Sequence, residues 1–286
     1  MLPAAGSWDG SATPPLPMFV TVPASRKAPR PAPWRFKVWH PDLGWVASLP
    51  ALAAGQFEAL QSVNDWLVAT DGRPVAAAPV RFRSAEIFGA EKLLEELAGS
   101  ALFGPGRLSL QRLGALRLPP PLALVRVSDG PDVLVVENSD PFWVCRDVLA
   151  ETAGPVGRVG FGSGKAFVAT VAALGNELEP VRRVFYWGDL NPAGVDIASD
   201  AAAMSAACGL PVLEPAGPLW AAMAALPASS AGRYDWSERG AGWLGEGLWA
   251  ASKLVRAAGG RVAQERVAPA VVAAAVAALS DGSAVL

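Results

Sequence analysis

The sequence contains a single histidine, His40, and only two cysteines, Cys145 and Cys208, among its 286 residues. So few imidazole and thiol groups exclude most zinc sites, together with the Ser/His/Asp triads and Cys/His dyads of many hydrolases. The two cysteines have no motif spacing, so we expect both to be structural; a disulfide between them is the alternative.

Long apolar runs are also missing. The longest one near the C-terminus, VAPAVVAAAVAAL, covers 13 residues, which is too short to span a membrane. The first residues, MLPAAGSWDGSATPP, have neither the basic start nor the apolar segment of a signal peptide. We therefore expect a cytoplasmic protein without a membrane segment.

Charged residues make up only 17% of the chain, and the net charge of −2 argues against a generally basic nucleic-acid binder. The first 40 residues differ, because Asp9 is the only acid beside five basic residues: Arg26, Lys27, Arg30, Arg35 and Lys37. This segment is either a local phosphate-binding strip or a solvated, proline-rich leader.

The composition changes along the chain and indicates four parts. Residues 1–33 form a flexible, proline-rich leader, and residues 34–118 form a small α+β module. Within that module we predict a strand over residues 34–40 and helices over residues 52–69 and 90–102. Residues 119–226 form an α/β domain, and residues 227–286 form a helical extension that packs on it.

Short apolar runs alternate with helical segments from residue 119 onward, a pattern typical of a parallel sheet flanked by helices. The predicted strands are LALVRV, DVLVVEN, VGRVGFGSGK, RRVFYWGD and LPVLEP. Ligands bind at the carboxyl ends of such strands. Glu137, the stretch 162–165 and Asp189 all lie at these predicted ends.

Glu137 and Asp189 follow two of these strands, so their carboxylates can converge on one divalent cation. A site of oxygen ligands without histidine or thiolate favours Mg²⁺ or Mn²⁺. A metal ion held in this way can polarise a phosphate and activate a water for hydrolysis. The structural alternatives are an exposed strand-end acid for Glu137 and a turn-stabilising role for Asp189.

Two further polar residues have two interpretations each. Asn191 either provides a third, neutral metal ligand or caps the helix that begins at Pro192, and the cap is the favoured interpretation. Glu265 either completes the acidic cluster, if the C-terminal segment folds back onto the sheet, or is a solvated charge at a helix start.

The stretch GFGSGK at residues 160–165 is not a P-loop, because Val159 and Ala166 occupy the positions that require Gly and Ser or Thr. Gly162 and Gly164 would still let backbone amides approach a phosphate, with Lys165 adding positive charge. An ordinary strand-to-helix turn is the alternative, and ATP binding is a remote hypothesis.

The chain has two tyrosines, Tyr186 and Tyr234, which bear on covalent DNA cleavage. Tyr186 lies inside a predicted strand and is expected in the core, and Tyr234 lies in a loop outside any helix-turn-helix pattern. Hydrolysis by a metal-activated water is therefore favoured over a tyrosyl intermediate. Three tryptophans at 236, 243 and 249 are expected in the core rather than in a base-stacking platform.

Five motifs in order resemble the JetD family, the nuclease subunits of Wadjet anti-plasmid systems: RFRSAEIFGAEK, LVVEN, GFGSGKA, YWGDLNPAG and AQERV. The resemblance covers roughly residues 40–270. It implies a Toprim fold related to that of topoisomerase VI, preceded by a winged-helix-like or arm-derived module. It also implies Mg²⁺-dependent cleavage of plasmid DNA, recruitment by a condensin-like SMC ATPase complex, and a homodimer.

Carried over by position, Glu137 matches the first acid of the family and Asp189 the first acid of its Asp-x-Asp turn. Asn191 stands in the second Asp position, and Glu265 matches a C-terminal acid. We further predict DNA contacts at six positions: Arg81, Arg83, Lys92, Gly162, Gly164 and Lys165.

The chain departs from the family at Asn191, which removes one negative charge from the turn, and in its shorter N-terminal region. Two hypotheses follow. The first is a Mg²⁺-dependent endonuclease in which Glu137, Asp189, Lys165 and Glu265 act in catalysis. The second is a degenerate Toprim protein that binds DNA or a partner complex without cleavage.

Overall fold

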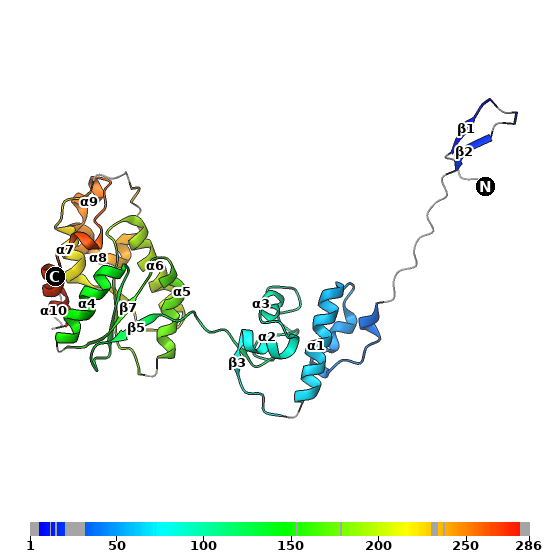
Figure 1. The fold of residues 1–286 in the computed structure, drawn as a ribbon, viewed down its shortest axis with the longest axis horizontal. Helices are drawn as coiled ribbons and strands as arrows, with labels where there is room; N and C mark the ends of the chain where they lie inside the picture. The colour runs from blue at the N-terminus through cyan, green and yellow to red at the C-terminus, as the bar shows by residue number, and fades with distance from the viewer. Residues whose placement is uncertain are drawn as a thin grey trace. The chain divides into compact units, whose positions relative to one another are not determined.

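The computed structural model describes residues 6–11, 13–14, 16–20, 32–71, 73–152, 154–177, 179–229, 234–236 and 238–280. The chain divides into two compact units, Met1–Arg117 and Leu118–Leu286 (Figure 1). We call them the N-terminal unit and the sheet unit. Each has its own hydrophobic core, and each is described by itself.

The N-terminal unit begins with an antiparallel pair of strands, β1 (Gly6–Asp9) and β2 (Leu16–Val20), within the predicted leader. Residues 21–31 lie outside the described residues. Two 3₁₀ helices follow, η1 (Pro33–Arg35) and η2 (Pro41–Ser48). Each begins with a proline, whose fixed φ suits a helix start.

The strand predicted over residues 34–40 is therefore wrong, because η1 occupies its start and no strand follows in it. The tryptophans that suggested a strand instead donate hydrogen bonds from their indole groups to backbone carbonyls. Trp39 Nε1 donates to the carbonyl of Trp34 at 2.8 Å, and Trp34 Nε1 donates to the carbonyl of Leu49 at 3.1 Å.

Three α-helices complete this unit: α1 (Ala54–Thr70), α2 (Val80–Phe88) and α3 (Leu93–Ala98). Helix α1 was predicted. The helix expected over residues 90–102 is the shorter α3. Helix α2, which was not predicted, precedes it and is capped by Gly89 with φ 69°. Strands β3 (Ala78–Pro79) and β4 (Ala115–Leu116) pair in parallel. The antiparallel hairpin of a winged helix is not found among the described residues from 32 to 117.

The sheet unit is an α/β structure with a mixed sheet in the order β5-β7-β6-β8-β9. Its strands are β5 (Ala123–Arg126), β6 (Asp132–Val136), β7 (Val156–Phe161), β8 (Val184–Trp187) and β9 (Leu213–Pro215). The α/β class was predicted, but a wholly parallel sheet was not correct, since β5 runs antiparallel to β7. The connection from β5 to β6 is too short for the crossover that parallel strands need.

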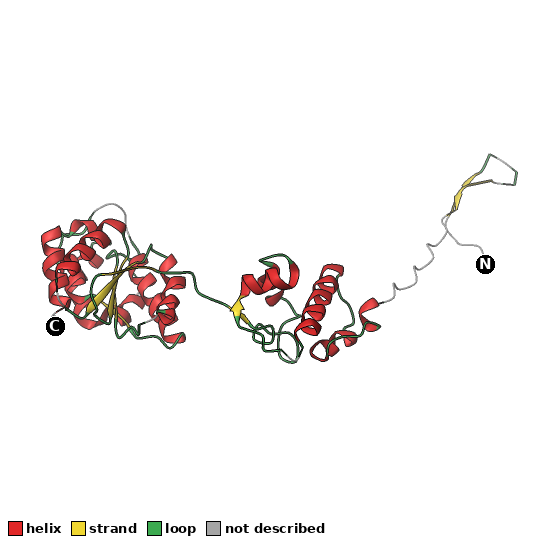
Figure 2. Ribbon diagram, turned by 60° about the horizontal axis from the view of Figure 1, so that its bottom comes forward, coloured by secondary structure: helices red, strands yellow, loops and turns green. Residues whose placement is uncertain are grey.

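Helices cover both faces of this sheet (Figure 2). The sheet unit contains α4 (Ser139–Glu151), α5 (Ala166–Thr170), η3 (Val171–Asn176), α6 (Pro192–Ala207), α7 (Gly217–Ala224), α8 (Arg239–Ala251), α9 (Lys253–Ala257), η4 (Gln264–Arg266) and α10 (Pro269–Ser280). Helices α4 and α10 lie on one side of the sheet, and α5 and α6 lie on the other (Figure 1). Helix α7 was not predicted.

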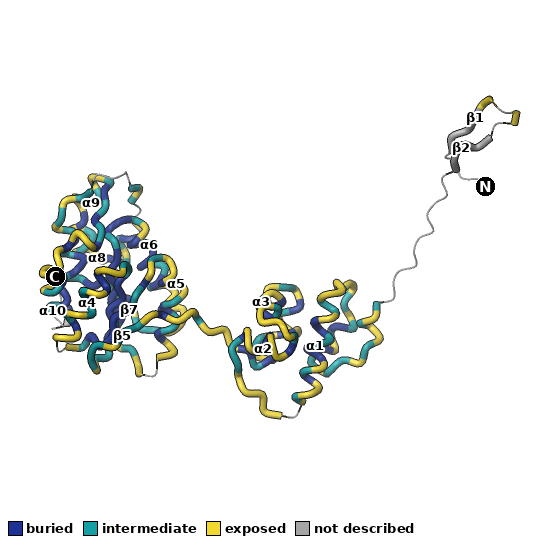
Figure 3. Tube along the Cα trace, in the orientation of Figure 1, coloured by how far each residue is buried: buried dark blue, intermediate teal, exposed yellow. Residues whose placement is uncertain are grey.

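The buried segments of the strands lie at the centre of the unit, and exposed residues lie on the surrounding helices and loops (Figure 3). Every residue of β6 and β8 is buried, which explains why residues 133–136 of β6 and all of β8 are apolar or aromatic in the sequence. As predicted, Trp236, Trp243 and Trp249 pack against this core. No helix in the described parts of the chain is long and apolar enough to cross a membrane.

Both cysteines are free thiols, Cys145 buried in α4 and Cys208 exposed at the end of α6. Burial raises the pKa of Cys145 to about 12, so its reactive thiolate is scarce at neutral pH. We expect a thiol reagent at about pH 8 to label Cys208 quickly, and Cys145 only after unfolding. Fast labelling of a folded Cys208→Ser variant, measured by mass spectrometry, would contradict this burial.

Candidate functional site

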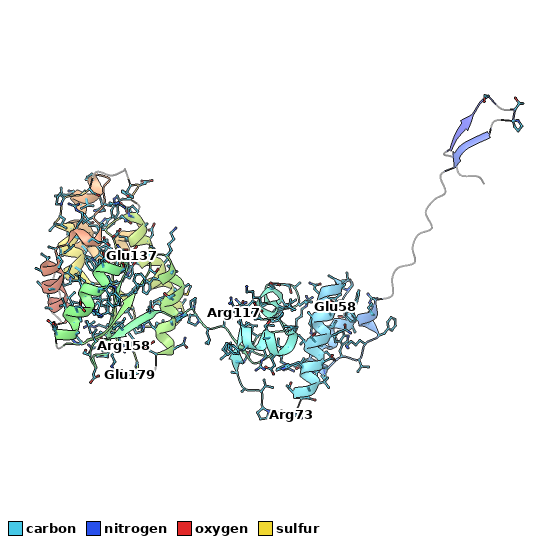
Figure 4. All side chains as sticks on the ribbon, in the orientation of Figure 1. Glu58, Arg73, Arg117, Glu137, Arg158 and Glu179 are labelled. Atoms are coloured by element: carbon cyan, nitrogen blue, oxygen red, sulfur yellow. The ribbon has the colours of Figure 1, made fainter. Side chains whose placement is uncertain are left out.

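The first two predicted site residues, Glu137 and Asp189, follow the neighbouring parallel strands β6 and β8. These strands pair up to Val136 and Trp187, and the Glu137 N–H continues the ladder by donating to the carbonyl of Trp187 at 2.9 Å. The Asp189 N–H then donates to Glu137 Oε2 at 3.3 Å. The structure thus brings the two acids together at the carboxyl ends of these strands. Figure 4 shows Glu137 there, away from Arg158 and Glu179.

Glu137 is held through one of its two carboxylate oxygens. The Tyr186 hydroxyl donates to Oε2 at 2.9 Å, in addition to the Asp189 N–H. A Cβ atom at Gly188 would lie 2.3 Å from the same Oε2, so this turn has room only for glycine. The other oxygen, Oε1, lies on the side of Gly164, 4.0 Å from where a Cβ atom there would be.

Asp189 is held by donors from two other segments. Its Oδ1 accepts from Asn138 Nδ2 at 3.3 Å and from the Gln264 N–H at 3.0 Å. Its Oδ2 has one long contact, 3.5 Å from Asn191 Nδ2. Asn138 and Gln264 were not predicted as site residues, although each directly precedes or follows a predicted acid in the sequence.

Gln264 joins the C-terminal segment to the ends of both strands. Its buried side chain donates from Nε2 to the carbonyl of Trp187 at 2.9 Å and accepts at Oε1 from the Asn138 N–H at 3.0 Å. Leu190 and Val262 add a pair of backbone hydrogen bonds. The C-terminal segment therefore folds back onto the sheet, which was the condition for Glu265 to join the acids.

Glu265 reaches the cluster through Asn138. Its Oε1 accepts from Asn138 Nδ2 at 2.9 Å, and the same amide group donates to Asp189. The amide nitrogen of Asn138 thus bridges two carboxylates that would otherwise repel each other. Glu265 itself is exposed, so it lies at the rim of the cluster.

Burial and the charges of neighbouring carboxylates both act on the two inner acids. Burial is the largest cause that raises the pKa of Glu137, followed among the raising causes by the charges of Asp189 and Glu265; hydrogen bonds from Tyr186 and the Asp189 N–H lower it. Burial is also the largest cause that raises the pKa of Asp189, and the charge of Glu265 raises it further. The Gln264 N–H, the charge of Arg261 and the Asn138 side chain lower it. Such a pair gains from a bound cation, which would offset both effects.

Asn191 caps α6, as the favoured interpretation predicted. Its Oδ1 accepts from the Gly194 N–H at 2.8 Å, and its Nδ2 faces Asp189. A Cβ atom at Gly194 would lie 2.2 Å from the carbonyl oxygen of Asp189, so the turn is tightly closed. Because the amide nitrogen, not the oxygen, faces Asp189, Asn191 would have to turn its amide group to bind a metal beside that acid.

The glycine-rich stretch curls beside Glu137. The Gly162 N–H donates to the carbonyl of Val136 at 2.8 Å, and the Ser163 N–H donates to the carbonyl of Glu137 at 3.1 Å. Ser163 and Gly164 have φ of 54° and 60°, a left-handed pair that reverses the chain. Lys165 follows as an exposed residue at the start of α5.

The three DNA contacts predicted in the N-terminal unit differ in exposure. Arg83 is buried, lies over the Trp66 ring and binds Glu86 and the carbonyl of Ala76. It is therefore a core residue of its unit, and we correct its prediction as a DNA contact. Arg81 pairs with Glu95 at 3.2 Å but stays largely exposed, and Lys92 is exposed.

The donor set fits Mg²⁺ or Mn²⁺ in kind, because it consists of carboxylate oxygens without thiolate or imidazole. In the described residues no group of three or more His, Cys, Asp or Glu side chains lies close enough to hold a metal ion. Mg²⁺ is often held by only one or two carboxylates, with waters and substrate phosphates as its other ligands. Glu137 and Asp189 match that smaller set.

The sheet unit is thus an α/β structure with a pair of half-buried acids at the carboxyl ends of adjacent parallel strands. No family model, no curated protein and no solved structure matches this chain.

Proposed function

We propose that the chain is a metal-dependent DNA endonuclease, a hydrolase of the Toprim type that uses Mg²⁺ or Mn²⁺. The observation that carries the proposal is the pairing of Glu137 and Asp189 by the hydrogen bond from the Asp189 N–H to Glu137 Oε2, 3.3 Å long. Two half-buried acids at strand ends, each with a raised pKa, favour a bound cation. The motif resemblance adds DNA as the substrate.

The residues of the site have distinct tasks in this proposal. Glu137 and Asp189 would hold the cation; the oxygens least engaged in hydrogen bonds are Oε1 of Glu137 and Oδ2 of Asp189. The cation would polarise a phosphate and activate a water.

Lys165 supplies positive charge for the scissile phosphate from the loop that follows β7, and Gly164 in that loop leaves room for the DNA backbone. Gly162 is buried and its N–H is bonded to the carbonyl of Val136, so we withdraw it as a DNA contact. Glu265 adds a third negative charge at the rim.

The partners in this proposal come from the resemblance alone. They are plasmid DNA, a condensin-like SMC ATPase complex and a second copy of the chain. Arg81 and Lys92, which are exposed, remain proposed DNA contacts.

One observation favours the alternative, a degenerate Toprim protein that binds DNA or a partner complex without cleavage. Asn191 stands where the family has a second acid, and its amide oxygen is used by the helix cap. The turn therefore directs an amide nitrogen, rather than a third carboxylate, toward Asp189.

An Asn191→Asp variant separates the two functions. Aspartate caps helices as well as asparagine does, so the fold should persist while a carboxylate is added beside Asp189. If the proposed endonuclease is correct, the wild-type chain nicks supercoiled plasmid in Mn²⁺, and Asn191→Asp nicks faster. Nicking by Asn191→Asp alone would support the degenerate protein. Asn191→Ser, which keeps a cap without adding charge, is the matched control.

A further inference from the structure

Tyr186 is a buried core residue whose hydroxyl group reaches the acidic pair. Its ring stacks on Phe167 with a centroid distance of 5.1 Å and an interplanar angle of 8°, and it meets the edge of Trp243 at 6.1 Å. Its carbonyl accepts from Trp220 Nε1 at 2.8 Å. The contacts with Phe167 and Trp243, together with the hydrogen bond to the Tyr186 carbonyl, fix the ring, so its hydroxyl group has a defined position.

That position makes the two oxygens of Glu137 unequal. Oε2 accepts from the Tyr186 hydroxyl at 2.9 Å and from the Asp189 N–H at 3.3 Å. Gly188 closes against the same oxygen, since a Cβ atom there would lie 2.3 Å from it. Oε1 has no hydrogen bond within the described residues and is the oxygen left for a ligand.

We propose that Tyr186 is a positioning residue that makes Glu137 a one-oxygen ligand and so biases the site toward Mg²⁺ and Mn²⁺ over Ca²⁺. This inference rests on the proposed cation site. Mg²⁺ requires a compact octahedral shell, in which a carboxylate contributes one oxygen. Ca²⁺ is larger, takes six to eight oxygens and often binds both oxygens of a carboxylate. Occupying Oε2 therefore disfavours Ca²⁺ more than the smaller ions.

The test is the ratio of the Ca²⁺ and Mn²⁺ dissociation constants, measured by calorimetry on the full chain. Tyr186→Phe removes one oxygen atom and keeps the ring in its packing. Losing the shorter of the two hydrogen bonds to Oε2 should strengthen the binding of Ca²⁺ relative to that of Mn²⁺ by about tenfold, the lower end of effects at residues that orient metal ligands. If Tyr186 has only a structural role, the variant should bind both ions more weakly by the same factor. Tyr234→Phe, at the other tyrosine of the chain, should leave the ratio unchanged.

The outcomes separate this inference from the proposed function. If the wild-type chain binds Mn²⁺ and the ratio is unchanged in a folded Tyr186→Phe variant, the role of Tyr186 is refuted and the cation site stands. If the wild type binds neither ion, with or without DNA, both proposals fail. If the variant does not fold, a wild-type crystal soaked in Mn²⁺ decides, because an ion bound to both Oε1 and Oε2 would overturn the inference.

Discussion

Replacing Glu137 with glutamine is expected to abolish plasmid nicking and to weaken Mn²⁺ binding about a hundredfold or more, since the loss of a ligand should exceed the effect of losing an outer residue. The fold should survive, because the glutamine oxygen can still accept from the Tyr186 hydroxyl and the Asp189 N–H. Calorimetry with Mn²⁺ and a supercoiled-plasmid assay measure the two losses.

The metal-free variant should also melt at the same temperature as the wild type or higher. Burial raises the pKa of Glu137, so its ionised form costs stability at pH values above the ordinary carboxyl pKa, and glutamine removes that cost. Glu246→Gln, at an exposed acid in α8, is the matched control and should change neither binding nor melting. Full nicking by Glu137→Gln would rule out the assigned role of Glu137.

The largest expected effect on stability is at the other end of β6, where Asp132 is fully buried. Its carboxylate accepts four hydrogen bonds of 2.9–3.1 Å from Arg182 and Arg183. Asp132→Ala should lower the free energy of unfolding of the sheet unit by about 2–3 kcal/mol. The cost stays below that of a fully buried ion pair because both arginines reach solvent.

Hydrogen exchange of the β6 and β8 amides, followed by mass spectrometry, reports the sheet unit separately from the N-terminal unit. Asp129→Ala is the control, because Asp129 is almost fully exposed in its ion pair with Arg126, and exposed pairs contribute little. If Asp132→Ala left the protection of both strands unchanged, the buried ion pair would not anchor the sheet.

The strands that carry the site were predictable because they are buried on both faces. Residues 133–136 of β6 and all of β8 appear in the sequence as unbroken apolar runs, and the first polar residues after them are Glu137 and Asp189. The composition of β5 does not reveal its direction, but the short connection to β6, visible in the sequence, is the signal that would have indicated an antiparallel strand. Arg83 was mistaken for a DNA contact because its burial against Trp66 depends on the packing of α1 on α2.

The acids were predictable, but the residues that hold them were not. Asn138 and Gln264 meet across 126 positions of sequence separation, and only the return of the C-terminal segment brings them together. Tyr186 was correctly expected in the core, yet its residue type does not reveal that its hydroxyl ends against Glu137. Such contacts follow from tertiary packing and have no local sequence pattern.

The central claim is that Glu137 and Asp189 together hold a divalent cation. An anomalous difference map from a crystal of the full chain soaked in Mn²⁺ tests it most directly. The account predicts a strong peak within coordination distance of both carboxylates, on the side of Glu137 Oε1. An empty site at high Mn²⁺, with and without bound DNA, would contradict the claim.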